Sequence, residues 1–301
     1  MPSRHLPQSA RLRGFSLVEL LVASTIALMA MGAVASLLGT FGRAVSQSQT
    51  LVDLNARIRS TAWRLRQDLR GGTAPPNPWL RPEANAGYLQ IVESGTTAPD
   101  ALAGDCDDRL MLTTSSLGSP FFGRLQGAAG FESSVAEVVW FCVASGQTFE
   151  GQPLFNLHRR QLLVSGAPGA GVFLNGVAAS IDRNLTDVSC RNNGGQQVAN
   201  SLGDLTIPAN RFWNVVGGTT TLQGDRLGED VVLANVIAFD VRTYSTGSSA
   251  YINQQFNTNY DLNTGPDTGS RLPGLQVQIR CVEPVSRQIR QVTVVHSFEE
   301  M

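Results

Sequence analysis

The pattern of apolar positions predicts one long helix at the start of the chain. Residues 15–41 form a continuous apolar run in which Glu19 is the only formally charged residue. A helix over this run would be about 40 Å long, enough to span the roughly 30 Å hydrocarbon core of a bilayer. Further along, apolar residues recur every three or four positions, as in an amphipathic helix: Leu51, Leu54, Ile58, Ala62, Leu65 and Leu69. We therefore predict a single helix that ends at the glycine pair Gly71 and Gly72, which would serve as its C-terminal cap.

Beyond this helix, a proline-containing segment at 71–87 leads into short β-type runs separated by glycine-rich turns. The predicted strands are 88–92, 109–114, 136–144, 161–164 and 236–244. The clearest strand pair comes last. Apolar and polar residues alternate in 275–281, and 290–298 follows a short turn, as in an antiparallel hairpin with one buried face. The apolar stripe of the helix is the expected partner of that face, which predicts an α+β fold with an antiparallel sheet head.

The single acidic residue in the apolar run needs an explanation. A charged side chain at the centre of a bilayer costs roughly 2.5 to 3.5 kcal/mol on insertion scales, so we interpret Glu19 as functional. Arg4, His5, Arg11 and Arg13 precede the run without any acidic residue. Because positive charge is enriched on the cytoplasmic side, the N-terminus is predicted to lie in the cytoplasm and the remainder of the chain outside.

Two ways of processing the N-terminus are compatible with the residues. The small residues Ala33, Val34 and Ala35 before Ser36 are typical of an ordinary signal-peptide cleavage site. Against this, the apolar run continues past that site as far as Phe41, which favours a retained helix. The second possibility begins at the sequence GFSLVELLVAS, residues 14–24.

This stretch resembles the class III leader junction of type IV prepilins and type II secretion pseudoprepilins. The resemblance implies that prepilin peptidase cuts between Gly14 and Phe15 and methylates Phe15 as the new terminus. Glu19 is then the fifth mature residue. Its carboxylate is expected to pair with the N-terminal amine of a neighbouring subunit, in a helix bundle where water screens charges weakly.

The resemblance also implies a division of the chain and a role. The expected parts are a leader at 1–14, a transmembrane helix at 15–41, its amphipathic continuation at 42–70, a linker at 71–87 and a β-rich periplasmic head at 88–301. The order of strands and the segment LHRR are similar to those of J-type pseudopilins and W-type minor pilins. We expect a single-pass inner-membrane protein that later enters a type IV pilus-like filament, where it acts in assembly or priming.

The expected partners are prepilin peptidase, other pilin or pseudopilin subunits and the inner membrane. Two alternatives remain: a subunit of a type II secretion pseudopilus, and a signal-anchored periplasmic binding or adhesion protein that does not polymerise.

The formal net charge is −1, and removing three leader arginines makes it −4 (−1 − 3). This balance does not suggest a polyanionic partner, so we expect no binding of nucleic acid.

Four cysteines lie beyond the apolar run, namely Cys106, Cys142, Cys190 and Cys281. In an oxidising compartment an even number of well-separated cysteines predicts up to two disulfides, with three possible connectivities. A zinc site would instead show closely spaced cysteine or histidine pairs.

No spacing predicts catalysis or a cofactor. Outside the leader the histidines are His158 and His296, and neither has a Ser/His/Asp or metal-binding pattern around it. In the polar segment 245–271, the oxygen-bearing residues Asp261, Asn263 and Asp267 alternate as in a calcium loop, but a closing glutamate is missing. They are weak calcium candidates, and the segment is equally compatible with a contact surface or a long loop.

Overall fold

The structure is a computed structural model, and the chain divides into two compact units between Val52 and Asp53, inside helix α1. The described residues are 16–77, 79–93, 104–124, 130–165, 173–174, 177–178, 187–193, 196–211, 213–216, 219–222, 230–260 and 271–298. Each unit is described by itself below.

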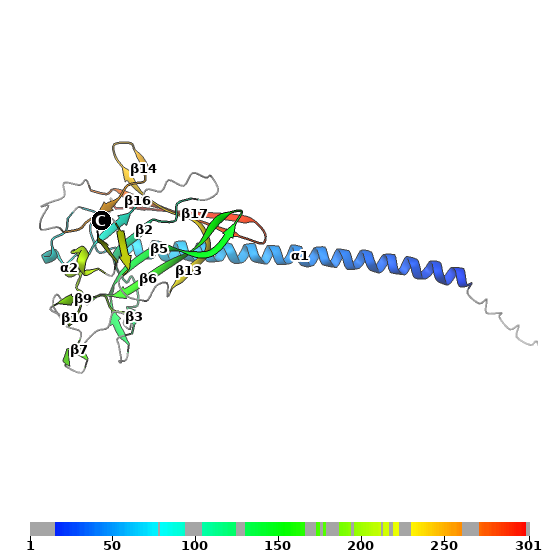
Figure 1. The fold of residues 1–301 in the computed structure, drawn as a ribbon, viewed down its shortest axis with the longest axis horizontal. Helices are drawn as coiled ribbons and strands as arrows, with labels where there is room; N and C mark the ends of the chain where they lie inside the picture. Colours follow the sequence, from blue (N-terminus) through cyan, green and yellow to red (C-terminus); the bar gives the residue numbers. More distant parts are fainter. Residues whose placement is uncertain are drawn as a thin grey trace, which may run out of the picture. The chain divides into compact units, whose positions relative to one another are not determined.

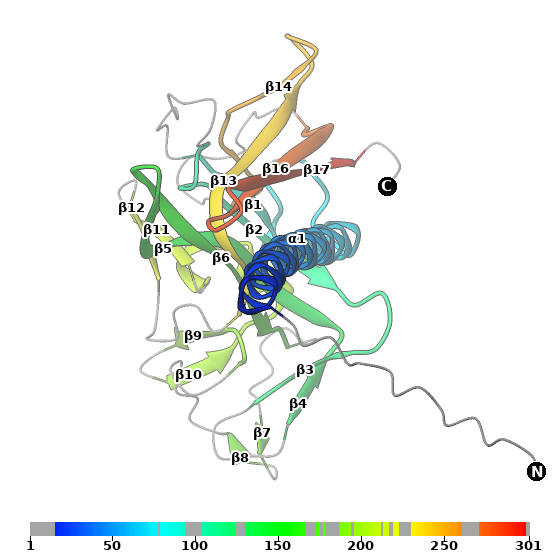
Figure 2. The same cartoon turned by 90° about the vertical axis from the view of Figure 1, so that its right-hand side faces the viewer.

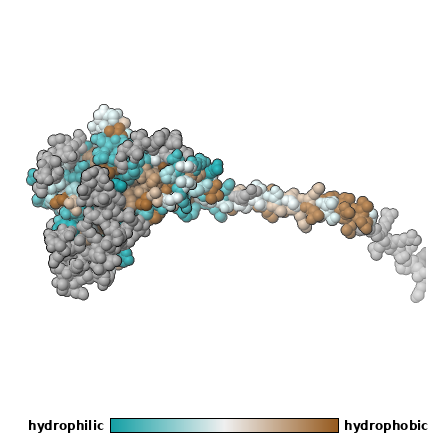
Figure 3. All heavy atoms as spheres, viewed as in Figure 1, coloured by the Kyte–Doolittle hydropathy of each residue, from teal (hydrophilic) through white to brown (hydrophobic). Residues whose placement is uncertain are grey.

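Helix α1 runs from Leu17 to Arg70, 54 residues, which corresponds to about 81 Å of helix (Figure 1). Its predicted end at Arg70 is confirmed. Among the described residues, α1 is the one helix whose length and composition would allow it to cross a membrane. In the first unit its large apolar side chains are exposed, from Leu17 at 82% to Phe41 at 62%, and Figure 3 shows them at the N-terminal end of the helix.

The second unit contains an antiparallel sheet of nine strands in the order β15-β1-β2-β5-β6-β13-β16-β17, with β14 paired to β13. Its strands are β1 (Leu89–Val92), β2 (Arg109–Ser115), β5 (Val135–Phe149), β6 (Gln152–Leu163), β13 (Val231–Ser245), β14 (Ala250–Ile252), β15 (Phe256–Asn257), β16 (Gly274–Glu283) and β17 (Gln288–Ser297). The sheet curls around the part of α1 that belongs to this unit (Figure 2). The predicted α+β class is confirmed.

Smaller elements surround this sheet. Two-stranded sheets are formed by β3 (Phe121–Gly123) with β4 (Phe131–Ser133), β7 (Phe173–Leu174) with β8 (Val177–Ala178), β9 (Cys190–Asn193) with β10 (Gln196–Ala199), and β11 (Trp213–Val216) with β12 (Thr219–Leu222). Short helices are η1 (Pro82–Ala84), α2 (Leu202–Leu205) and η2 (Pro208–Asn210). The sequence pattern did not predict these elements, because runs of two to four residues carry no measurable periodicity.

The core lies between α1 and one face of the sheet. Leu54, Ile58, Ala62, Leu65 and Leu69 are all buried in one cluster with residues of the sheet, so the predicted apolar stripe is confirmed from position 54 onward. The hairpin strand β16 contributes the alternating set Leu275, Val277, Ile279 and Cys281, each with no exposed surface. The period-2 pattern therefore faces the helix, as expected for a strand with one buried side.

The opposite face of the sheet is also covered. Residues that alternate with the α1-facing positions, such as Met111 in β2 and Phe141 in β5, belong to a second buried cluster with Leu205 of α2. A buried cation reinforces this side, since the Arg211 guanidinium lies 3.6 Å from the centre of the Tyr88 ring. Because both faces are buried, strands β2 and β5 read as continuous apolar runs instead of clean alternation.

Strand β6 is the largest difference from the predicted elements. The sequence predicts a strand at 161–164, whereas β6 covers Gln152–Leu163 and pairs along β5. The missed part, 152–160, contains His158, Arg159 and Arg160, which are polar yet 6%, 2% and 6% exposed. Polar residues interrupt the apolar pattern on which strand prediction depends, so a strand that buries charged groups is easily missed.

The end of α1 is confirmed at the predicted glycine pair, but the physical reason differs. In the described residues positive φ among glycines occurs at Gly87, Gly146 and Gly151, so Gly71 does not act through a left-handed cap. Instead β2 passes directly over it: the Ser115 amide donates to the Gly71 carbonyl at 2.7 Å, and a Cβ on Gly71 would lie 2.2 Å from the Ser115 carbonyl oxygen. Close backbone approach therefore requires glycine here.

Candidate functional site

The first turn of α1 places Glu19 against its own backbone. The Glu19 carboxylate accepts a hydrogen bond from the Ser16 amide at 3.0 Å, and the Ser16 hydroxyl accepts one from the Val18 amide at 3.4 Å. Ser16 directly precedes the first helical residue, and Glu19 is the third. The Glu19 carboxylate caps the Ser16 amide as in a capping box, whereas the Ser16 hydroxyl accepts from the second helical amide instead of the third. Amides at a helix start lack partners within the helix, so this pair satisfies two of them.

Sequence reasoning interpreted Glu19 only as half of an intersubunit pair and missed its capping role. The signal was present, because Ser16 and Glu19 form the S-x-x-E pattern that marks a helix start. A negative charge is also favoured beside the positive end of the helix dipole. Glu19 therefore has a stabilising interaction before any neighbouring subunit is considered. The predicted processing residues Gly14 and Phe15 lie outside the described residues.

In the second unit, α1 is fixed to the sheet by a buried ion pair. Asp68 of α1 accepts hydrogen bonds from Arg159 of β6 and from the Trp140 indole of β5, at 2.7 Å and 2.8 Å. The side chains of Arg159 and Asp68 are 2% and 5% exposed. Burial strengthens the electrostatic interaction and makes loss of either partner costly. This arrangement sets which face of the helix meets the sheet.

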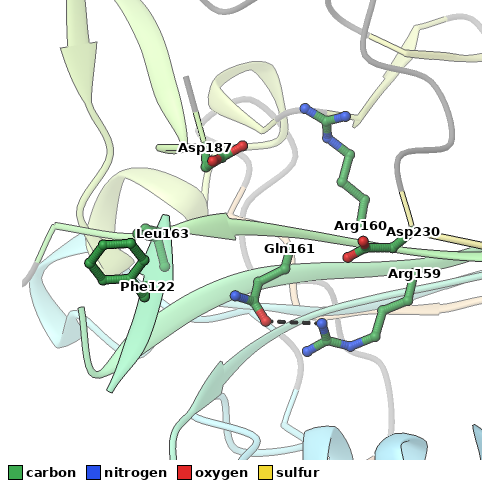
Figure 4. Close-up of a pocket in the computed structure, with 7 residues that line it drawn as sticks. All are labelled: Phe122, Arg159, Arg160, Gln161, Leu163, Asp187 and Asp230. Atoms are coloured by element: carbon green, nitrogen blue, oxygen red, sulfur yellow. Dashed lines mark hydrogen bonds between the residues drawn. The ribbon is translucent and has the colours of Figure 1, made fainter. Parts of the chain in front are cut away.

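A polar pocket of about 200 Å³ lies beside β6 (Figure 4). It is lined by Phe122, Arg159, Arg160, Gln161, Leu163, Asp187 and Asp230. The Gln161 side-chain oxygen accepts a hydrogen bond from Arg159 at 2.9 Å, which Figure 4 shows as a dashed line. Among the described residues that line it, none is a serine, cysteine or histidine, so these residues do not form the usual pair of nucleophile and base.

The structure brings two of the four cysteines together. The Cys142 thiol on β5 is within hydrogen-bond reach of the Cys106 thiol, and burial raises the pKa of Cys142 well above its usual value. Cys281 lies in β16 of the large sheet, whereas Cys190 lies in β9 of a separate two-stranded sheet. All four are thiols here, and the predicted disulfides remain a prediction.

The two histidines without a catalytic or metal-binding sequence pattern are in packed positions. His158 stacks on Phe141 with ring centres 5.4 Å apart, and His296 meets Phe298 edge-on at 4.6 Å. Burial, and then the charge of Arg70, lower the pKa of His296. The weak calcium candidates Asp261, Asn263 and Asp267 lie outside the described residues.

Comparison with known proteins identifies the N-terminal segment. Residues 10–35 match the family model of the prokaryotic N-terminal methylation motif. This match agrees with the resemblance of GFSLVELLVAS to a prepilin junction and indicates a type IV pilin-like segment that is a substrate of prepilin peptidase. No curated protein and no solved structure matches the chain.

Proposed function

We propose that the chain is a structural subunit, a minor pilin or pseudopilin, of a type IV pilus-like filament. The observation that carries the proposal is the methylation motif at residues 10–35, which coincides with the exposed apolar half of α1. Prepilin peptidase would release the leader at Gly14 and expose the amine of Phe15. The likeness to W-type minor pilins and J-type pseudopilins belongs to this proposal, as does a role in filament assembly or priming.

In the proposed pathway, α1 first anchors the chain in the inner membrane, with the head in the periplasm. Its exposed side chains, among them Leu21, Ile26 and Leu38, face lipid at this stage and neighbouring helices in the filament. Transfer from lipid to protein keeps these side chains out of water. The apolar surface that would aggregate in solution thus supports both the membrane-bound and the filamentous state.

The capping role of Glu19 adds a step to this proposal. In the isolated chain the carboxylate is held by the Ser16 amide, so the intersubunit pair with the amine of a neighbouring Phe15 would compete with this bond or share the carboxylate. A carboxylate has two oxygens and can accept several hydrogen bonds, so both interactions are compatible. The charge of Glu19 would attract the amine of the neighbouring subunit, while one of its oxygens would accept the hydrogen bond from the Ser16 amide at the start of the helix.

Mass spectrometry of the N-terminal peptide tests processing. We expect N-methylated Phe15 as the first residue of protein taken from the envelope. A chain beginning at Ser36 would refute the proposal, because cleavage there removes most of the apolar helix.

Two substitutions separate the roles of Glu19. Glu19→Ala removes both charge and cap, whereas Glu19→Gln retains an oxygen that accepts the Ser16 amide proton. If the charge pairs with a neighbour, both variants insert into the membrane at normal levels and both are depleted in sheared filaments. Wild-type incorporation of either variant, with unchanged leader cleavage, would contradict the intersubunit pair.

A further inference from the structure

A cluster of acidic side chains is buried where β1 ends and β2 begins. Glu93 directly follows β1, and Asp105 and Asp108 precede β2. One carboxylate oxygen of each residue lies within 4.8 Å of the others. The three residues are 9%, 8% and 0% exposed. Burying carboxylates costs several kcal/mol each unless a positive group compensates them.

Two oxygens in this cluster receive no hydrogen bond from an N–H or hydroxyl group of the described residues. Asp108 accepts the Val241 amide at 2.7 Å through Oδ2, but its Oδ1 accepts none. Asp105 accepts the Asp107 amide at 3.0 Å through Oδ1, but its Oδ2 accepts none. Buried polar atoms are normally satisfied, and an exception calls for an explanation such as a bound ion. These oxygens belong to different residues of the same cluster, which points to a shared ligand.

The electrostatics of the cluster agree with this. Burial is the main cause that raises the pKa of Asp105 to about 7 and that of Asp108 to about 9. Hydrogen-bond contact with the Asp107 carboxyl adds to the first, and the charge and hydrogen-bond contact of Glu93 add to the second. The surroundings therefore disfavour negative charge on these side chains. A cation would supply positive charge beside these carboxylates, and a proton shared between the carboxylates would be the alternative.

We propose that Glu93, Asp105 and Asp108 bind one Ca²⁺ ion. The ligands are all carboxylate oxygens, which suit a hard cation and not zinc or copper. Calcium–oxygen distances of about 2.3 to 2.6 Å allow ligand oxygens up to about 5 Å apart across the ion. Calcium also tolerates irregular geometry, as expected for ligands from two separate segments, and takes its remaining ligands from water.

The bound ion would join the end of β1 to the start of β2. Through the Asp108 bond to the Val241 amide, it would also connect these strands to β13 across the sheet. The inference concerns the head alone and does not depend on the proposed filament role. The sequence signal was the acidic run GDCDDR at 104–109, which carries no calcium-loop spacing because Glu93 is supplied from a different segment.

The test uses the full processed chain in detergent, stripped with a chelator and titrated with CaCl₂. We expect calorimetry to detect about one Ca²⁺ per chain, and Ca²⁺ to raise the midpoint of thermal unfolding. Asp108→Asn keeps an oxygen for the Val241 amide while removing a ligand charge, so it should fold in chelator at least as well as wild type. Its Ca²⁺ affinity should fall at least tenfold. Asp53→Asn, which alters an exposed aspartate on α1, is the matched control and should respond like wild type.

Four results would overturn the proposal. The first is a wild-type chain with neither binding heat nor a change in unfolding midpoint, which would mean that the carboxylates share protons. The second is an Asp108→Asn variant that binds Ca²⁺ as tightly as wild type. The third is loss of binding in a variant changed at Asp261 and Asp267 instead. The fourth is an equal response to MgCl₂ at the same concentration, which would refute the choice of calcium.

Discussion

Arg159 of β6 donates two parallel hydrogen bonds to Asp68 of α1, from Nε to Oδ2 and from Nη2 to Oδ1, both 2.7 Å long. The two residues are 91 positions apart in the chain, and both are buried. A two-point contact between planar groups fixes orientation as well as distance. The pair therefore determines the rotation of the last turns of α1 against the sheet. Packing of small and branched apolar residues alone would restrict this rotation less.

Breaking this pair should destabilise the head strongly. In Asp68→Ala the Arg159 guanidinium remains buried without its partner, and we expect the free energy of unfolding to fall by about 3 to 5 kcal/mol. Urea denaturation followed by tryptophan fluorescence measures the loss. Asp53→Ala, which removes an exposed pair with Arg57, serves as the control and should change stability by less than about 1 kcal/mol. Equal effects in the two variants would contradict the assigned role.

Gly71→Ala should be among the most damaging small substitutions in the head. The added methyl would overlap the Ser115 carbonyl oxygen, and a backbone atom cannot move away without disturbing β2. Overpacking of this kind costs about 1 to 3 kcal/mol. Gly118→Ala is the matched control, since nothing lies within 4 Å of its new methyl. Comparable unfolding midpoints for the two variants would show that β2 can shift.

Among the possible disulfide pairings, we predict Cys106 with Cys142. The two thiols would form an S–S bond and pass two electrons and two protons to a disulfide-containing oxidant of the cell envelope, whose disulfide is reduced to two thiols. Closing a loop of about 36 residues should add about 3 to 4 kcal/mol to stability. Non-reducing peptide mapping by mass spectrometry identifies the linked peptides. Cys281→Ser should leave that linked pair unchanged, whereas a link from Cys106 to any other cysteine would show the pairing to be wrong.

Acidification should destabilise the head partly through His296. Its pKa is lowered in the folded state, so the unfolded chain binds the proton more readily. Stability is then lost as pH falls through the unfolded value of about 6.5 toward the lower folded value. His296→Gln should show a smaller loss of unfolding free energy between pH 7.5 and about pH 5. Parallel curves of unfolding free energy against pH for wild type and variant would contradict a role of His296. Arg70→Gln should also reduce the loss of stability at low pH, because it removes the charge that lowers the pKa of His296 after burial.

The sequence was sufficient for the elements whose patterns are strongly periodic. The end of α1, its buried stripe and the β16–β17 hairpin were all predicted, because amphipathic periods of 3.6 and 2 reflect burial directly. Strand β6 was largely missed. Its Arg159 is buried only because Asp68 lies opposite, and such pairing between distant segments leaves no local pattern.

The same limit applies to the candidate sites. One short stretch of sequence was enough to propose roles for Gly14, Phe15 and Glu19, and these roles stay predictions. The hydrogen bond from the Ser16 amide to Glu19 was added by the structure, although the S-x-x-E pattern was present in the sequence. Cys106 lies just before β2, and Cys142 follows Phe141, which is opposite Arg109 at the start of β2, so the pairing of these strands brings the two cysteines together. Three connectivities were possible without that register. The acidic cluster likewise requires knowledge that Glu93 lies beside the segment before β2.

The shared core of α1 and the sheet has a consequence for the timing of export. Thr61 of α1 donates a hydrogen bond to the Val232 carbonyl, 171 residues later, and Ile279 and Val294 join the same core later still. Contacts of such high sequence separation form slowly, because a long loop must close before they stabilise anything. In the proposed topology, with the head in the periplasm, α1 would emerge first and its stripe would stay uncovered until β16 and β17 arrive. The head would then complete its folding only after translocation, and during this interval the stripe is the surface that a periplasmic holdase would need to shield.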